Sequence, residues 1–318
     1  MSIGEVKQNM PDWKEVTKEI NVLAENTSNP LDTVRRKYLN TFSKYTNRNV
    51  IAYYSAFVQK PSIDGTAIND NDMNAFMQTI YGLDKSKGLD LILHTPGGNL
   101  ASAVSIVTYL KSIFYNDIRA FVPQMAMSAG TMISLSCKEI ILGKQSALGP
   151  IDPQYGGLSA SGVVEQYQRA VDDIKKDNSC IPLWQVMYSK YNPVFIGDCE
   201  KAVKWANEQT YQWLCDNMFQ EDNDAKEKAN KIVEALSDHS KTYFHGRQYH
   251  IDELKEIGIK VKALEEMDKD KKIDGCADLQ DCLLTVHHSY MQSFANSNAI
   301  KIIENQNGNA MIVNTMKE

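Results

Sequence analysis

The sequence lacks the motifs that usually indicate a bound metal or nucleotide. No CxxC pair occurs among its six cysteines, so a structural zinc site is not expected. We interpret the cysteines as reduced thiols, several of them filling the core. No phosphate-binding loop of the GxxxxGK[ST] type is present, so we expect this chain to use no ATP. We therefore predict no cofactor, while an ATPase partner in a separate chain is compatible with the sequence.

The sequence also lacks long apolar runs and an excess of positive charge. The most apolar segment, residues 125–142, is broken by polar residues and falls short of the about 18 apolar residues that a membrane span needs. Residues 1–16 show no basic stretch followed by an apolar one, which predicts no secretory signal and a cytoplasmic location. The 34 Lys and Arg against 40 Asp and Glu give a net charge of −6, which argues against nucleic acid or an anionic membrane as the main partner.

What the sequence does contain is a regular alternation of short β-rich runs and helical periodicities. Such an alternation predicts βαβ units with right-handed crossovers, hence an α/β fold with a mostly parallel sheet. Strands are expected at 50–54, 89–93, 118–122 and 139–142, and helices at 71–82, 100–114 and 128–137.

Both ends of the chain extend this core. Residues 11–45 read as helical, with Pro30 in a first turn, and 161–236 are largely helical. Later elements are expected at 252–257 (helix), 258–261 (a final strand), 277–296 (helix) and around Asn307-Gly308 (β-hairpin). The apolar stripe of the 277–296 helix fits self-association and core packing equally well. We divide the chain into a helical N-terminal extension (1–48), a catalytic domain (49–262), and a C-terminal linker, helix and hairpin (263–318).

Three short motifs carry candidate chemistry. A strand ends in Thr95-Pro96-Gly97-Gly98, where glycines leave backbone N–H groups open to an oxyanion, although an ordinary strand-to-helix turn would look the same. Ser128 opens the next helix between small residues, where it is either an accessible nucleophile or an N-cap. Asp152 lies in a Pro/Gly loop after a strand, either as a functional carboxylate or as a turn former.

Taken in this order, the motifs resemble those of Clp-type peptidases and signal-peptide peptidases. The resemblance is strongest to the serine dehydrogenase proteinase family, through the strings LDLILHTPGG, GPIDPQ and HGRQYHIDELKEIGIKV, and it covers about residues 50 to 262. It implies a Clp/crotonase-like fold and a serine peptidase that acts on peptides or proteins. Because relatives of this fold assemble into rings or compact oligomers, it also implies a homo-oligomer.

The resemblance assigns roles to individual residues. Ser128 becomes the nucleophile of a catalytic triad, with the backbone N–H groups of Gly98 and Ala129 as the oxyanion hole. Asp152, 24 residues after Ser128, stands where Clp peptidases place their histidine, so acid and base are exchanged in order. His245 is our first choice of base and His239 the second, in a Ser, Asp, His order.

The remaining histidines and two lysines are weaker candidates. His250 begins a short helix, His94 is expected to pack at a strand end, and His287 and His288 are expected at the surface or an interface. A Ser-Lys dyad, as in signal-peptide peptidases, would use Lys175 or Lys176 as a neutral amine.

Two further functions compete with peptide-bond hydrolysis. A crotonase-type acyl-CoA enzyme would share the fold and the glycine turn, but it would have no use for the serine. A catalytically inactive scaffold or binding protein would leave Asp152 and His245 too far from Ser128 to couple.

Overall fold

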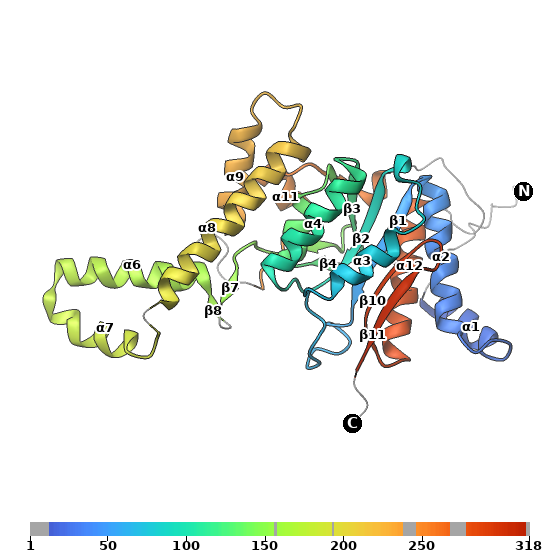
Figure 1. Ribbon diagram of the computed structural model, residues 1–318, viewed down its shortest axis with the longest axis horizontal. Coiled ribbons are helices and arrows are strands. Elements are labelled where there is room, and N and C mark those ends of the chain that lie inside the picture. The colour runs from blue at the N-terminus through green and yellow to red at the C-terminus, as the bar shows by residue number, and fades with distance from the viewer. Residues whose placement is uncertain (1–12, 156–157, 193, 238–245, 268–277, 316–318) are drawn as a thin grey trace, which may run out of the picture.

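The protein is built around a central, mostly parallel seven-stranded sheet (Figure 1). Its structure is a computed structural model that describes residues 13–155, 158–192, 194–237, 246–267 and 278–315. The strand order is β11-β10-β1-β2-β3-β5-β9, in which β1, β2, β3, β5 and β9 pair in parallel. The hairpin strands β10 and β11 add antiparallel pairs at one edge. The bounds are β1 Asn49–Ser55, β2 Leu89–His94, β3 Ile118–Val122, β5 Glu139–Leu142, β9 Val261–Ala263, β10 Ala299–Asn305 and β11 Ala310–Asn314.

Helices cover both faces of this sheet. One face packs against α1, α2 and α12, and the other against α3, α4, α5, α9, α11 and the end of α8. Such double coverage explains why the parallel strands are nearly continuous apolar runs. In β2, Leu91 and Leu93 face one layer and Ile92 the other, and all are buried. The bounds are α1 Trp13–Ala24, α2 Pro30–Thr46, α3 Asp72–Ile80, α4 Leu100–Phe114, α5 Ala129–Leu135, α8 Phe195–Trp213, α9 Ala225–Ser237, α11 Ile251–Ile257 and α12 Leu279–Ala295.

Two short parallel strands lie beside the main sheet and lead into the candidate site. Strand β4 (Met125–Ala126) pairs with β6 (Ala147–Leu148), with Ala126 opposite Leu148. The pairing places the start of α5 beside the loop that follows β6.

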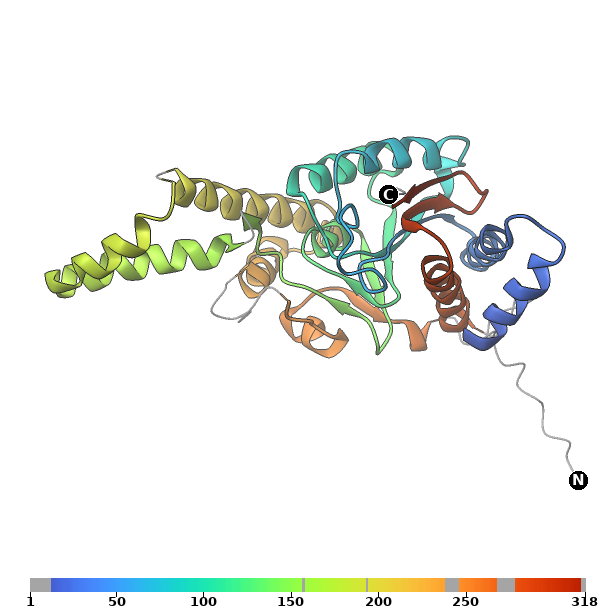
Figure 2. The same ribbon diagram turned by 90° about the horizontal axis from the view of Figure 1, so that it is seen from below.

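An arm projects away from the sheet, as both views show (Figures 1 and 2). It begins with the hairpin β7 (Gln154–Tyr155) and β8 (Leu158–Ser159), continues through α6 (Ala160–Lys176) and α7 (Ile181–Tyr188), and returns along α8. Many of its apolar side chains are exposed; Leu183 and Val186, for example, are each 63% exposed. The others are Tyr155, Leu158, Tyr167, Ile181, Met187, Tyr191, Val194 and Trp205.

The α/β fold and nearly all the predicted elements of the core are confirmed, with small shifts at their ends. The final strand was predicted too early: Gly258 instead ends α11 with a left-handed φ of 106°, so the strand begins at Val261. The N-terminal helical region is two helices, and Pro30 begins the second, as predicted. The apolar stripe of α12 is core: Leu283, Val286 and their neighbours pack against α2.

Among the described residues, no helix is long and apolar enough to cross a membrane. Three of the cysteines, Cys137, Cys199 and Cys282, are buried, as core-filling thiols should be.

Candidate active site

Ser128 has a backbone conformation that few residues other than glycine adopt. Its φ of 51° and ψ of −118° place it in a sparsely populated region, at the junction between β4 and α5. Such a conformation costs about 1–3 kcal/mol and persists only where the surrounding structure enforces it, most often at functional sites.

The Ser128 hydroxyl has no structural role in capping the helix. The residue occupies the N-cap position of α5, but its side chain makes no cap hydrogen bond. Within the described residues its Oγ has no hydrogen-bond partner, and the side chain is half-buried. The sequence allowed Ser128 to be either a nucleophile or an N-cap, and the structure shows no capping hydrogen bond for the second role.

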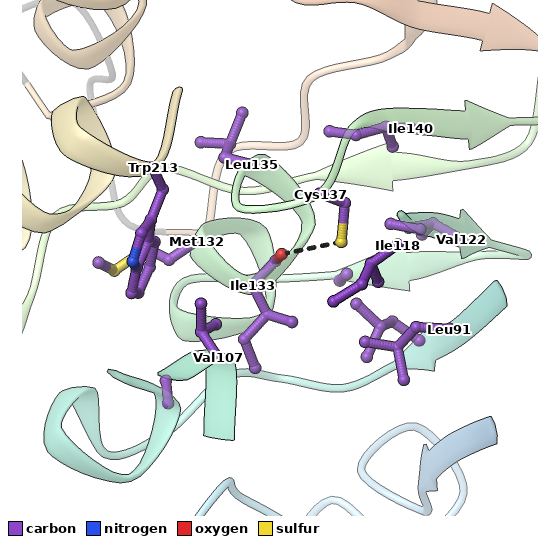
Figure 3. Packing of buried hydrophobic residues seen from close by; sticks show 14 of the residues in the cluster. Leu91, Val107, Ile118, Val122, Met132, Ile133, Leu135, Cys137, Ile140 and Trp213 are labelled. Carbon is purple, nitrogen blue, oxygen red and sulfur yellow. Dashed lines mark hydrogen bonds between the residues drawn. The ribbon is translucent and has the colours of Figure 1, made fainter. Parts of the chain in front are cut away.

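Helix α5 holds the strained turn in place because every one of its residues is buried. Figure 3 shows Met132 packed beside Trp213 of α8, while Ile133 faces Val107 and the strands. The Cys137 thiol donates to Ile133 O at 3.4 Å and closes the C-terminal end of the helix. Tight packing on all sides supplies the constraint that keeps Ser128 in its strained conformation.

The glycine turn lies directly against the serine. Gly97 has a φ of 90°, and a Cβ on it would lie 2.5 Å from Met127 O and 2.7 Å from Ser128 Cβ. Contacts that short are not tolerated, so only glycine lets these two turns approach so closely. The same imagined Cβ would lie 3.0 Å from the Ala129 nitrogen, so the Ala129 N–H also lies beside the contact between Gly97 and Ser128.

Two backbone N–H groups are available beside the serine. Gly98 has a φ of 151°, and within the described part of the chain neither its N–H nor that of Ala129 donates a hydrogen bond. The Ala129 N–H is one of the donors that the first turn of every helix leaves without an intrahelical acceptor. Unpaired N–H groups next to a serine hydroxyl suit the stabilisation of an oxyanion.

Asp152 is buried in the loop that follows β6. It is 1% exposed, and its Oδ1 accepts from the Ser161 N–H, at the start of α6, at 3.1 Å. The preceding loop is tied to the serine helix because the Gly149 N–H donates to Thr131 Oγ1 at 2.9 Å. Gly156 and Gly157 lie outside the described residues.

The two preferred base candidates, His239 and His245, also lie outside the described residues. The residues on both sides of the segment that carries them are nevertheless fixed to the Asp152 loop. The Ile151 N–H donates to Leu236 O at 3.0 Å, and Leu148 and Tyr249 exchange two backbone hydrogen bonds of 3.0 and 2.8 Å. Both ends of the histidine segment are therefore anchored within a few residues of Asp152.

The structure gives other roles to the remaining histidines. His250 precedes α11, and its Nδ1 lies 2.9 Å from Ser146 O. His94 is fully buried against the rings of Tyr54 and Phe57, the packing role that its strand end predicted. Burial lowers the pKa of His94 to about 3, so the ring is neutral.

His287 corrects an expectation. It was predicted to lie at the surface or an interface, but it is buried 5.3 Å from the ring of His94, and burial lowers its pKa well below the usual value. The reason is that α12 lies in the core layer, packed against α2. His288 is half-buried and contacts Trp13 edge-to-face.

The two lysine candidates are not brought near the serine. Lys175 and Lys176 are exposed in the last turn of α6, and Lys175 pairs with Asp172 at 3.9 Å. At 1.5 Å per residue they lie about 22 Å along the helix from the end that contacts Asp152.

Sequence reasoning missed Ile68, which supports the glycine turn. The Ile68 N–H donates to Gly97 O at 2.7 Å, and Ile68 O accepts from the Asn99 N–H at 2.9 Å. A Cβ on Gly98 would overlap the Ile68 backbone at 2.4 Å. Because Ile68 contributes through its backbone, no side-chain motif in the sequence could have indicated it.

Comparison with known proteins identifies the family of the chain. The family of ClpP-like SDH-type serine proteinases matches residues 33–270, most of the chain. The chain belongs to this family. The serine dehydrogenase proteinase resemblance inferred from the motifs is thereby confirmed, and the mostly parallel sheet fits the ClpP-like fold.

Two curated relatives come from the archaeon Methanocaldococcus jannaschii, and both are described only as uncharacterized proteins. They are 29% and 30% identical over 194 residues, which is 61% of this chain. The match spans 59% and 60% of the relatives' own length. Their descriptions name no activity and no substrate.

Proposed function

We propose that this ClpP-like proteinase hydrolyses peptide bonds through an acyl-enzyme on Ser128, without using ATP itself. The observation on which the proposal rests is the close contact between the glycine turn at Gly97 and the turn at Ser128. A serine hydroxyl without a hydrogen-bond partner in the described chain is held in a strained conformation beside the free N–H groups of Gly98 and Ala129. Strain of this kind is maintained where geometry matters for chemistry.

The proposed reaction follows acyl transfer through a tetrahedral intermediate. Ser128 Oγ attacks the scissile carbonyl carbon while its proton passes to a histidine base. The negative charge that develops on the carbonyl oxygen is stabilised by the two N–H groups, and each such donor is worth about 10²- to 10³-fold in kcat. The protonated base then gives its proton to the leaving amine, and a water molecule, deprotonated by the same base, hydrolyses the ester.

His245 is the proposed base, with His239 as the alternative. Both lie outside the described residues, in the stretch between Leu236 and Tyr249, and these two flanking residues are hydrogen-bonded to the Asp152 loop. Asp152, buried between the anchors, is proposed to orient the imidazole and to stabilise its protonated form.

The test measures the rate of covalent labelling by a fluorophosphonate probe in the wild-type protein and in single variants. Labelling should vanish in Ser128→Ala and fall strongly in Asp152→Asn and in one of His245→Ala or His239→Ala. Lys176→Ala serves as the matched control and should label at the wild-type rate, because Lys176 is exposed at the far end of α6. A properly folded wild type that does not label, in any oligomeric state, would make an inactive scaffold the better account.

We also propose that the chain self-associates through the exposed apolar side chains of the arm, while the cytoplasmic location stays a prediction. Since α12 is used in the core, we place the contact on the arm, which carries most of the exposed large apolar side chains among the described residues. Sedimentation should show an oligomer for wild type and a smaller species for the double variant Leu183→Asp, Val186→Asp. An unchanged mass would place the contact elsewhere.

A further inference from the structure

A lysine from the C-terminal hairpin is buried beneath the glycine turn. Lys301 in β10 is 1% exposed, yet its ammonium group is fully hydrogen-bonded. Its Nζ donates to Asp72 Oδ1 at 2.8 Å, to Asp72 Oδ2 at 3.1 Å and to Ala67 O at 2.7 Å. Burying a charge is costly unless it is paired and its hydrogen bonds are satisfied, and here both conditions hold.

Its partner Asp72 is equally buried and equally well satisfied. The carboxylate begins α3 and is 2% exposed. Besides Lys301, its Oδ2 accepts from the Tyr53 hydroxyl at 2.8 Å and from the Asn69 N–H at 3.0 Å. The ion pair thus joins strands β1 and β10 to the loop that precedes α3.

The backbone contacts of the pair fall on either side of Ile68. Lys301 holds the carbonyl of the preceding residue, Ala67, and Asp72 holds the N–H of the following residue, Asn69. The peptide groups that flank Ile68 are therefore fixed by two opposite charges. Hydrogen bonds to charged groups are shorter and stronger than neutral ones, so this arrangement fixes the position of Ile68 firmly.

Ile68 in turn holds the glycine turn. It pairs through its N–H with Gly97 O and through its carbonyl with the Asn99 N–H, so both residues that flank Gly98 are bound to it. The 2.4 Å approach of an imagined Gly98 Cβ to the Ile68 backbone shows that the two segments are in direct contact. A shift of Ile68 would consequently shift the Gly98 N–H.

We propose that Lys301 and Asp72 are positioning residues that set the orientation of the Gly98 N–H through Ile68. The inference rests on the proposed function, since it assigns this N–H to the oxyanion hole. Lys301 lies beyond residues 33–270, which match the family, so this support comes from the C-terminal hairpin of this chain.

The test compares two buried ion pairs of the same strand. Lys301→Met breaks the pair beneath the turn, whereas Arg35→Met removes the buried cation that pairs with Glu304 and leaves that carboxylate the longer contact of 3.4 Å to Arg36. In the described part of the chain, Arg35 and Glu304 make no hydrogen bond or ion pair with the glycine turn. Both variants lose a buried cation, and both should be less stable than wild type. Each is assayed at a temperature and denaturant concentration at which it is fully folded.

Two readouts separate positioning from stability. Hydrogen–deuterium exchange of peptides covering residues 66–70 and 95–99 should rise at least tenfold in Lys301→Met and stay within twofold of wild type in Arg35→Met. Fluorophosphonate labelling should slow at least tenfold in Lys301→Met alone. The double variant Lys301→Met, Asp72→Asn leaves no unpaired charge. Its labelling should still be slow, because Ala67 O still lacks the hydrogen-bond donor that Lys301 supplies.

The outcomes are distinguishable. Exchange that changes equally in both variants, or labelling at the wild-type rate in folded Lys301→Met, would overturn the positioning role. If wild type itself fails to label while exchange still responds only to Lys301→Met, the support of Ile68 by Lys301 and Asp72 is upheld and the proposed function fails.

Discussion

Gly97→Ala is the sharpest single perturbation of the proposed site. The added methyl group would lie 2.5 Å from Met127 O and 2.7 Å from Ser128 Cβ, and both are rigidly held. An ordinary contact requires about 3.4 Å or more, so one turn must move by about 1 Å relative to the other. Alanine at a φ of 90° adds about 1–2 kcal/mol of backbone strain.

Gly82→Ala is the matched control. Gly82 also has a positive φ, 78°, but a Cβ there would meet nothing within 4 Å. It therefore carries the backbone strain without the collision, and it lies just beyond the end of α3 rather than at the glycine turn. The difference between the two variants isolates the effect of pushing the two turns apart.

The expected activity loss follows from how sensitive acyl transfer is to geometry. Misplacing reacting groups by about 1 Å costs roughly 10²-fold, and loss of one oxyanion donor costs about 10²- to 10³-fold. Gly97→Ala should therefore label with fluorophosphonate at least about 100 times more slowly than Gly82→Ala. In urea titrations Gly97→Ala should also be the less stable of the two by about 1–3 kcal/mol, the usual cost of overpacking. Equal labelling rates in folded protein would refute the assignment of this turn to the site.

Two further predictions concern stability. Because burial lowers the pKa of His94 from 6.5 to about 3, unfolding takes up a proton below pH 6.5, so stability falls as the pH drops from about 6.5 toward 3. In His94→Leu, the free energy of unfolding measured in urea should depend less steeply on pH over this window, by up to about 1.4 kcal/mol per pH unit. An unchanged slope would contradict the neutral buried ring. Ser128→Gly should be more stable than Ser128→Ala. Glycine relieves about 1–3 kcal/mol of backbone strain, whereas the greater entropy of its unfolded chain costs only about 0.5–1 kcal/mol. The opposite order of stabilities in the same urea titration would argue against strain at Ser128.

The sequence could indicate candidate residues for the site, such as Ser128 and Gly98, because each belongs to a local motif. A serine at a helix start and a glycine pair after a strand are each defined within a few residues, and parallel strands bring their carboxyl ends to one edge. It predicted the base less sharply, since a histidine 117 residues after Ser128 is placed only by long-range pairing. That pairing is visible in the structure as the bonds of Leu236 and Tyr249 to the Asp152 loop.

The sequence-based prediction of the fold erred at the start of the final strand and left the role of one helix face open. Gly258 was included in the predicted strand 258–261 with the β-branched Ile259 and Val261, yet its freedom to adopt a positive φ made it the end of α11. The stripe of α12 could not be assigned to core or interface, because an apolar face has the same spacing in both cases. Only the packing of α2 against it decided between them.

Strand β10 shows that charged residues in a sequence do not always indicate a solvent-exposed strand. Its sequence, AIKIIEN, contains a lysine and a glutamate, which by ordinary preference would mark a solvent-facing edge, yet all seven residues are buried. Lys301 faces the layer of Asp72 and Glu304 the opposite layer of Arg35, so each charge needs a partner from a different part of the chain. A strand with buried charges on both faces fits only one register, because a shift by one residue would move each charge to the wrong face. The hairpin that the sequence treated as an addition is therefore fixed to the sheet by its charges. The same fixation brings Lys301 under the turn proposed to bind the oxyanion.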